Sequence, residues 1–373
     1  MASANGKNRN RRPRPRGLIA AYGFVLTLTA VFAVGVFGIA GGAGNMAPRG
    51  AAASLALPPS PVSPSKPSGS LSLPPRPSVP PVFRVLPDVD RADLVETTTD
   101  GQRLPKISAS GWMPWMAYAR RFKPEGPPAR VGLLMINLGA DETLMTRAID
   151  GLPGEVSLAF LPGTPDLPRW LLRARKHGHE SYLMLPVDDP GSPAERGIKP
   201  IEKSVDDAEN LRRLRSVMAR GEGYVGLVIP PPGLLSTSRR IGRALVQEIA
   251  GRGLGLVEIN PGAGVSSNYR LATELGVGYA RSSGVVDYSL GDQDIEANLD
   301  RLVEWVGHSA PDHPPRHAFV VMQPDAAAID VVAAWRERLV RQKTVSLIPI
   351  IGHFECSDAC LARARLQPAQ LQP

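Results

Sequence analysis

The side chains that could do chemistry lie at the ends of short apolar runs in the second half of the chain. Asp188 follows one such run, Glu258 lies near the end of another, and Asp287 follows a third. His179 precedes the apolar run at residues 181–185. Carboxylates and imidazoles are the groups that proteins use for general acid–base catalysis and for holding divalent metals. These four residues are therefore the candidates for a catalytic site.

Other patterns give weaker signals. His313 and His317 are four residues apart, but Pro314 and Pro315 between them exclude a helix that would present both imidazoles to one metal. The Pro-Gly-Ala-Gly stretch at residues 261–264 links an expected strand to an expected helix, which is a weak signal for a phosphate-binding loop. The sequence contains no GxSxG, P-loop or HExxH motif.

From residue 130 onward, short apolar runs alternate with longer amphipathic stretches, which predicts βα units and a largely parallel sheet. The predicted strands are residues 131–136, 156–160, 181–185, 224–229, 254–259, 277–280, 317–322 and 344–350. The predicted helices lie near residues 142–150, 167–177, 205–220, 236–252, 265–275, 292–306 and 325–341. This pattern fits an irregular (β/α) barrel. An open doubly wound sheet stays as the alternative, because periodicity does not give strand order.

Active sites on such folds lie at the carboxyl ends of the strands. Besides the carboxylates named above, this rule selects Asn137 after the first strand and Gln323 after the seventh. It also selects Asp189, the prolines at residues 230–232 and Arg281. Asp188 and Asp189 precede a proline, so they are either a turn or a pair of binding carboxylates.

The N-terminal residues predict a membrane anchor. The net charge is +8, and six of these charges lie in residues 1–17 without any acid, which leaves +2 for the remainder. Residues 18–43 are uncharged and mostly apolar, as a spanning helix requires. Basic residues beside a span stay cytoplasmic, so we expect one uncleaved helix in the cytoplasmic membrane and an exported domain. Cleavage near residues 40–44 is the alternative. No aromatic residue interleaves the arginines, so nucleic-acid binding is not expected.

Residues 44–125 are expected to be a linker and a lead-in to the folded domain. Residues 44–87 contain twelve prolines and no acid, so they cannot bury enough apolar surface to fold and are expected to be a disordered spacer. The aromatic residues Trp112, Trp115, Tyr118 and Phe122 either pack on the domain or stack against a sugar. The folded domain is assigned to residues 126–352 and a C-terminal tail to residues 353–373.

The two cysteines, Cys356 and Cys360, lie four residues apart near the C-terminus. In an exported domain they would meet an oxidising compartment. A local disulfide and a pair of free thiols both fit this spacing. Without a second Cys or His pair nearby, a zinc site is not indicated.

The order of several short motifs resembles the divergent polysaccharide deacetylase family. The motifs are Leu138-Gly139, residues 156–162, Gly178-His179-Glu180, residues 183–186, Asn210, Val225-Gly226, Ala280-Arg281 and residues 345–350. The resemblance covers roughly residues 130–350. It implies an irregular β/α barrel and descent from metal-dependent carbohydrate esterases.

The departures from the family pattern fall where the resemblance places the metal. The family ends its first strand in two aspartates, where this chain has Ile136 and Asn137. An Asn-His-Met-Gly stretch of the family corresponds to residues 229–233, which hold three prolines, and a Gly-His-Pro motif corresponds to Met322-Gln323-Pro324. We therefore expect no bound cofactor. Zinc or another divalent ion is expected only if the site is rearranged.

Three functions remain in view. The first is a membrane-anchored, exported deacetylase-like domain that has lost catalysis and binds a cell-envelope glycan. The second is an active esterase that uses a rearranged site of His179, Asp188, Glu258 and Asp287. The third is an envelope scaffold that binds an unidentified protein partner through residues 230–232 or through the tryptophans.

Overall fold

The computed structural model describes Leu86 and residues 92–121, 127–187, 197–230, 238–259, 266–286, 295–308 and 316–365, without the side chains of residues 361 and 363–365. No helix in these ranges is long and apolar enough to cross a bilayer. The expected span at residues 18–43, the basic segment before it and most of the linker lie outside the described residues, so they remain predictions.

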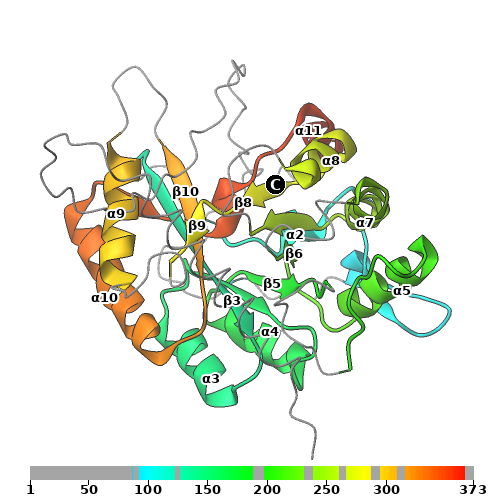
Figure 1. Cartoon of the computed structure of the whole chain (residues 1–373), viewed down its shortest axis with the longest axis horizontal. Helices are drawn as coiled ribbons and strands as arrows, with labels where there is room; N and C mark the ends of the chain where they lie inside the picture. Colours follow the sequence, from blue (N-terminus) through cyan, green and yellow to red (C-terminus); the bar gives the residue numbers. More distant parts are fainter. Residues whose placement is uncertain are drawn as a thin grey trace, which may run out of the picture. The chain divides into compact units, whose positions relative to one another are not determined.

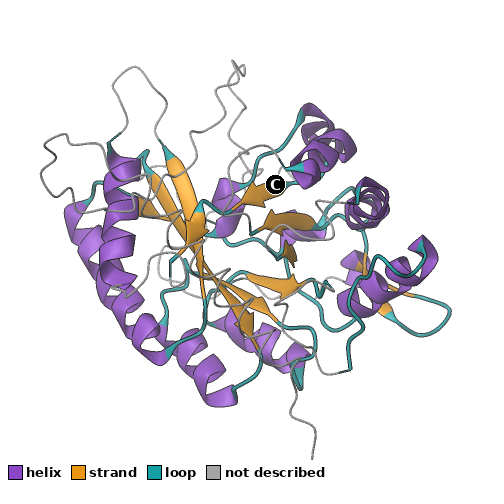
Figure 2. Ribbon diagram, in the orientation of Figure 1, coloured by secondary structure: helices purple, strands orange, loops and turns teal. Residues whose placement is uncertain are grey.

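A curled parallel sheet forms the centre of the domain (Figures 1 and 2). Its strand order is β8-β7-β6-β5-β4-β3-β10-β9, and β11 pairs with the start of β3. The strands are β3 (Arg130–Leu138), β4 (Ser157–Phe160), β5 (Ser181–Met184), β6 (Gly226–Ile229), β7 (Gly255–Glu258), β8 (Tyr279–Arg281), β9 (Gly284–Val285), β10 (His317–Met322) and β11 (Ser346–Leu347). Each predicted strand overlaps an observed one, and β9 was not predicted.

One short segment joins the two edges of this sheet. Strands β8 and β9 follow each other in the chain, yet β8 pairs with β7 and β9 pairs with β10. Between them, the Ser282 N–H donates to the Glu258 carbonyl at 2.9 Å, and the Ser283 N–H donates to the Phe319 carbonyl at 2.8 Å. This segment therefore curls the sheet on itself, as an irregular α/β barrel requires, and an open doubly wound sheet is not observed.

Within the described ranges, seven helices surround the outer face of the sheet (Figure 1). They are α3 (Glu142–Gly151), α4 (Leu167–Lys176), α5 (Asp207–Met218), α7 (Arg239–Gly251), α8 (Ser267–Leu275), α9 (Ile295–Gly307) and α10 (Ala326–Gln342). Several begin at a side chain that accepts N–H groups of the first turn. Asp141, Asp206, Ser266 and Asp325 do this for α3, α5, α8 and α10. All seven helices were predicted from the sequence.

Alternating strand residues build two apolar cores. Leu133 and Leu256 belong to the outer core, between sheet and helices. Leu134 and Val257, their neighbours in the chain, belong to the inner core inside the curl. This separation follows from the period of two in a strand, and it decides which polar side chains can face the interior.

Two segments outside the βα repeats close the amino-terminal end of the barrel. We call residues 92–121 the lead-in; they contain η1 (Ala92–Leu94), β1 (Val95–Thr97), β2 (Arg103–Pro105) and α2 (Pro114–Ala117). We call residues 350–356 the plug; they begin with η2 (Ile350–His353). Trp115 of the lead-in stacks on Phe354 of the plug, with ring centroids 5.8 Å apart. Lead-in and plug together form what we call the floor.

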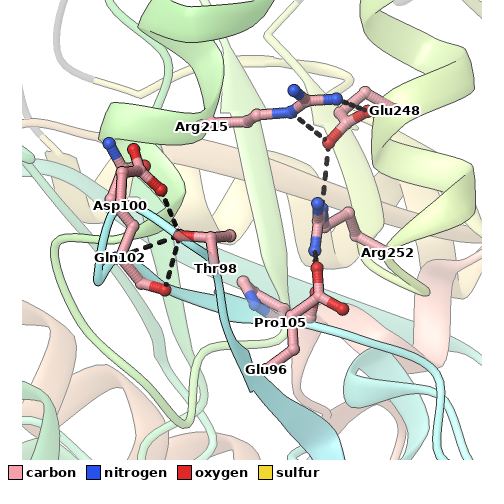
Figure 3. Close-up of polar contacts among 8 residues, drawn as sticks. All are labelled: Glu96, Thr98, Asp100, Gln102, Pro105, Arg215, Glu248 and Arg252. Carbon is pink, nitrogen blue, oxygen red and sulfur yellow. Dashed lines mark hydrogen bonds and ion pairs between the residues drawn. The ribbon is translucent and has the colours of Figure 1, made fainter.

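The lead-in is also fastened from outside by ion pairs (Figure 3). Arg252, just after α7, lies 2.5 Å from Glu96 of β1 and 2.9 Å from Glu248. Glu248 in turn pairs with Arg215 of α5 at 2.8 Å, and Arg252 also donates to the Pro105 carbonyl at 3.0 Å. This chain of charges ties the β1–β2 hairpin to two helices of the barrel.

The assignment of residues 353–373 to a tail needs correction for its first part. Phe354 and Cys360 belong to the inner core, and Glu355 exchanges two backbone hydrogen bonds with Tyr279 of β8. Cys356 and Cys360 form a disulfide with Cα atoms 5.2 Å apart, and helix α11 (Asp358–Arg365) follows. The folded domain therefore continues past residue 352, because this segment covers the exposed edge of β8.

Candidate functional site

The carboxyl ends of the strands form the mouth of the barrel, where parallel α/β folds bind ligands. Two amide side chains meet there. The Asn137 Nδ2 group at the end of β3 donates to Oε1 of Gln323, directly after β10, at 3.0 Å. Both side chains are half-buried, and β3 and β10 are neighbours in the sheet. This amide pair is the polar centre of the described mouth.

An irregular end of β3 positions Asn137. The register with β4 shifts between Met135 and Leu138, and Asn137 has a φ of 59°, in the left-handed region. Asparagine tolerates this conformation better than most residues. Gly139 follows with a φ of 144°, and a Cβ there would lie 2.0 Å from Oγ1 of the buried Thr164. A glycine at this position lets the chain turn sharply away from the mouth.

The surroundings of the pair are apolar. Phe319 and Val321 of β10 face the inner core, and Gln323 continues the same alternation toward the interior. Ile136, Met184 and Ile259 of the inner core lie at or next to the carboxyl ends of β3, β5 and β7. The described mouth therefore combines two neutral hydrogen-bonding groups with apolar walls.

His179 lies at the opposite end of the barrel, before β5. It is buried, and its Nδ1 and Nε2 atoms lie 2.8 Å and 2.9 Å from the carbonyls of Val156 and Ile149. Burial lowers the pKa of His179, while the two carbonyls act in the other direction. The imidazole thus links β5 to the segments before β4 and at the end of α3, and it does not face the mouth.

Glu258 ends β7 but points away from the interior. It shares the outward alternation of Leu256, and its buried carboxylate accepts hydrogen bonds from Ser266 at 2.6 Å, from Asn268 at 3.0 Å and from the Tyr279 hydroxyl. Burial and the neighbouring carboxylate raise the pKa of Tyr279. Glu258 therefore fastens the start of α8 and strand β8 to β7.

The structure does not bring the four candidate residues together in the part it describes. His179 and Glu258 lie at opposite ends of the sheet, and Asp188 and Asp287 lie outside the described residues. Asp189, Pro231 and Pro232 lie outside them as well. A rearranged catalytic site that includes Asp188 and Asp287 therefore remains a prediction.

The tryptophans take the first of their two predicted roles. Trp112, Trp115 and Tyr118 are buried in the inner core, at most 8% exposed, and so present no ring face to solvent. Phe122 lies outside the described residues.

Sequence reasoning did not select Glu180, the most extensively bonded buried acid in the described interior. It accepts hydrogen bonds from Arg120, Ser157, Tyr182 and Ile351. The rule for active sites of such folds points to the carboxyl ends of strands, and Glu180 lies before a strand. A single acid shortly before the hydrophobic run at residues 182–185 was the signal that could have identified it.

The amide pair does not fit zinc or a similar transition metal. Such ions are held by carboxylates, imidazoles or thiolates, whereas Asn137 and Gln323 are neutral and the Gln323 oxygen already accepts an N–H group. Across the described ranges, no three His, Cys, Asp or Glu side chains gather as a metal site. The described residues of the mouth thus differ from the ligand set that the family resemblance implies.

Comparison with known proteins identifies the family. The family model for divergent polysaccharide deacetylases matches residues 134–351. An uncharacterised protein of Agrobacterium tumefaciens C58 has a similar structure, with a TM-score of 0.58 and 23% sequence identity over 67% of this chain and 98% of its own. No curated protein matches the sequence.

Two further structures are more distant. A putative cellobiose-phosphate cleavage protein of Enterococcus faecalis V583 has a TM-score of 0.40 and 11% identity, over 58% of this chain and 95% of its own. A peptidoglycan deacetylase of Bacillus subtilis has a TM-score of 0.30 and 13% identity, over 66% and 94%. Because the family match spans more than half of its length, the chain belongs to the divergent polysaccharide deacetylase family.

Proposed function

We propose that this protein is a non-catalytic member of its family that binds a cell-envelope glycan at the mouth of the barrel. In this proposal the N-terminal helix anchors the chain in the cytoplasmic membrane, and the folded domain lies outside the cytoplasm. The observation that carries the proposal is the hydrogen bond between Asn137 and Gln323 at the mouth.

The chemistry of these two residues favours binding over catalysis. Deacetylation of this class uses a divalent ion to polarise the amide carbonyl and to activate water. Two neutral amides cannot replace that charge. They can, however, donate and accept hydrogen bonds at the same time, which matches the hydroxyl groups of an uncharged sugar. The apolar walls formed by residues such as Met184 suit the apolar faces of sugar rings.

Neither His179 nor Glu258 supports the alternative of an active esterase. Both side chains are buried, and both already contact polar groups of the protein itself. A scaffold role through the tryptophans is disfavoured by their burial in the inner core.

Titration calorimetry with neutral envelope oligosaccharides tests the proposal. We expect Asn137→Ala and Gln323→Ala each to weaken binding about fivefold, since each removes a hydrogen bond worth about 1 kcal/mol. Gln342→Ala, which changes an exposed amide at the end of α10, is the matched control and should bind normally. Hydrolysis of acetylated oligosaccharides that depends on an added divalent ion would overturn the non-catalytic part.

A further inference from the structure

The floor of the barrel is assembled around one buried carboxyl group. Glu180 lies directly before β5 and is fully buried. Its Oε1 atom accepts the backbone N–H of Arg120 in the lead-in at 2.8 Å. Its Oε2 atom accepts the N–H of Ile351 in the plug at 3.3 Å. One side chain thus holds two segments that lie 60 residues before it and 171 residues after it.

Two hydroxyl groups complete this cluster. Ser157 and Tyr182 donate to Oε2 of Glu180 at 3.2 Å and 3.1 Å, and Ser157 also accepts the N–H of Ile350 at 3.2 Å. Hydroxyls accept hydrogen bonds as well as donating them, so one of them can accept the hydrogen bond that a protonated carboxyl group donates. The cluster therefore accommodates Glu180 in its neutral form, and none of its four hydrogen-bond donors is a charged group.

The plug carries a second buried titratable group. His353 closes η2, and neither of its ring nitrogens has a hydrogen-bond partner among the described residues. Its Nε2 atom lies directly over Gly132, where a Cβ would be only 2.6 Å away. Its ring centroid is 5.6 Å from that of Phe319. Burial therefore favours the neutral imidazole, while the Val131 carbonyl acts in the other direction.

We propose that Glu180 and His353 form a two-group latch: both are neutral while the floor is closed, and local opening of the plug exposes both to water. Ionisation of either group favours opening, that of Glu180 as the pH rises and that of His353 as the pH falls. The two dependences oppose each other, so the latch makes opening of the floor nearly independent of pH between mildly acidic and neutral conditions.

The pKa values of the two groups support this geometry. Burial raises the pKa of Glu180 to about 7 from 4.5. Burial, with help from His317 and Arg130, lowers the pKa of His353 to about 3 from 6.5. Rising pH between about 4.5 and 7 favours opening through Glu180, because the open state ionises more readily. Falling pH between about 6.5 and 3 favours opening through His353, so the two effects nearly cancel between 4.5 and 6.5.

The other charged and titratable groups around the latch are Arg120 and Arg121 of the lead-in, Glu155 before β4, His179 before β5, Tyr182 of β5, Arg130 of β3, His317 of β10 and Glu355 of the plug. The Arg120 guanidinium donates to the Gly178 carbonyl at 2.6 Å and lies 3.6 Å from Glu155. Arg121 is exposed, and His317, whose ring centroid is 6.0 Å from that of His353, is exposed too. Of these groups, only the Tyr182 hydroxyl donates to the Glu180 carboxylate.

Hydrogen exchange of the purified full-length chain, corrected for intrinsic rates, tests the latch. In the native protein, we expect exchange of the Ile351 and Arg120 amides to change less than about threefold between pH 5 and pH 7. In Glu180→Gln, His353 is the latch group that still titrates, so the exchange rate should fall more than tenfold from pH 5 to pH 7. In His353→Leu, Glu180 still titrates, so the exchange rate should rise more than tenfold over the same range, at about a factor of ten for each pH unit.

Three results would overturn the proposal: equal slopes in the two variants, a steep slope in the native protein, or plug amides that exchange no faster than those of β10. The last would mean that the floor opens only with the whole domain. If a variant fails to fold, carbon-13 titration of the Glu180 carboxyl and the His353 ring in the native chain gives the same answer. Midpoints near 4.5 and 6.5 would exclude the latch.

Discussion

At the scale of single residues, Glu258 illustrates how a carboxylate at the right end of a strand can be structural. The position matched the expectation for a catalytic acid, but the alternation of β7 turns the side chain toward α8. Ser266, Asn268 and Tyr279 then supply its hydrogen bonds. A group held by three donors in a buried setting contributes to stability through all of them.

Glu258→Ala should therefore destabilise the domain by about 2–4 kcal/mol, because it leaves buried donors without an acceptor. Urea denaturation measures this loss. Glu274→Ala is the control, since Glu274 forms an exposed ion pair with Arg243 and should cost less than about 1 kcal/mol. Equal stability of the Glu258 variant and the native protein would contradict the structural role.

The sequence identified both members of the amide pair, but it could not show that they meet. Asn137 and Gln323 each follow a predicted strand, and they are 186 residues apart. Their contact depends on β10 lying next to β3, which local periodicity does not encode. The same limit explains why His179, although correctly placed before a strand, could not be assigned to the floor.

At the scale of elements, regular segments were predictable and short ones were not. Helices such as α3 and α10 begin at aspartates that cap them, and their apolar stripes are long enough to identify. Strand β9 has two residues and depends on its pairing with β10. The plug was assigned partly to a strand and partly to a tail. The residues that Phe354 packs against, among them Gly255, Gly278 and Trp115, are far away in sequence, so local patterns could not show these contacts.

The floor should carry a large share of the stability of the domain. Trp115 is 2% exposed and stacks on Phe354, so Trp115→Ala should cost about 3–5 kcal/mol in the free energy of unfolding. Leu172→Ala, at a side chain that is 49% exposed, is the control and should change it by less than about 0.5 kcal/mol. Chemical denaturation of both variants would decide the point. A small loss in the Trp115 variant would mean that the lead-in is only loosely attached.

At the scale of the whole molecule, a barrel of the deacetylase family follows a predicted membrane tether. The barrel is closed at its floor by segments largely outside the family match at residues 134–351, and its polar centre lies at the opposite end. The tether is inferred from the basic residues 1–17 and the apolar residues 18–43.

A reporter enzyme that works only outside the cytoplasm, fused after Pro87, should be active in cells. Replacing the six basic residues of the segment 1–17 with neutral ones should reduce this activity by weakening the topology signal. Activity of a cytoplasm-only reporter at the same position would contradict the orientation.

The central claim is that the mouth has exchanged a metal for an amide pair, and metal content tests it most directly. Elemental analysis and zinc titration calorimetry of the purified full-length protein should find no stoichiometric divalent ion. Asn137→Asp combined with Gln323→His restores a carboxylate and an imidazole and serves as a positive comparison, with zinc binding expected to increase. Tight, stoichiometric zinc in the native protein would contradict the account and would direct attention to esterase activity.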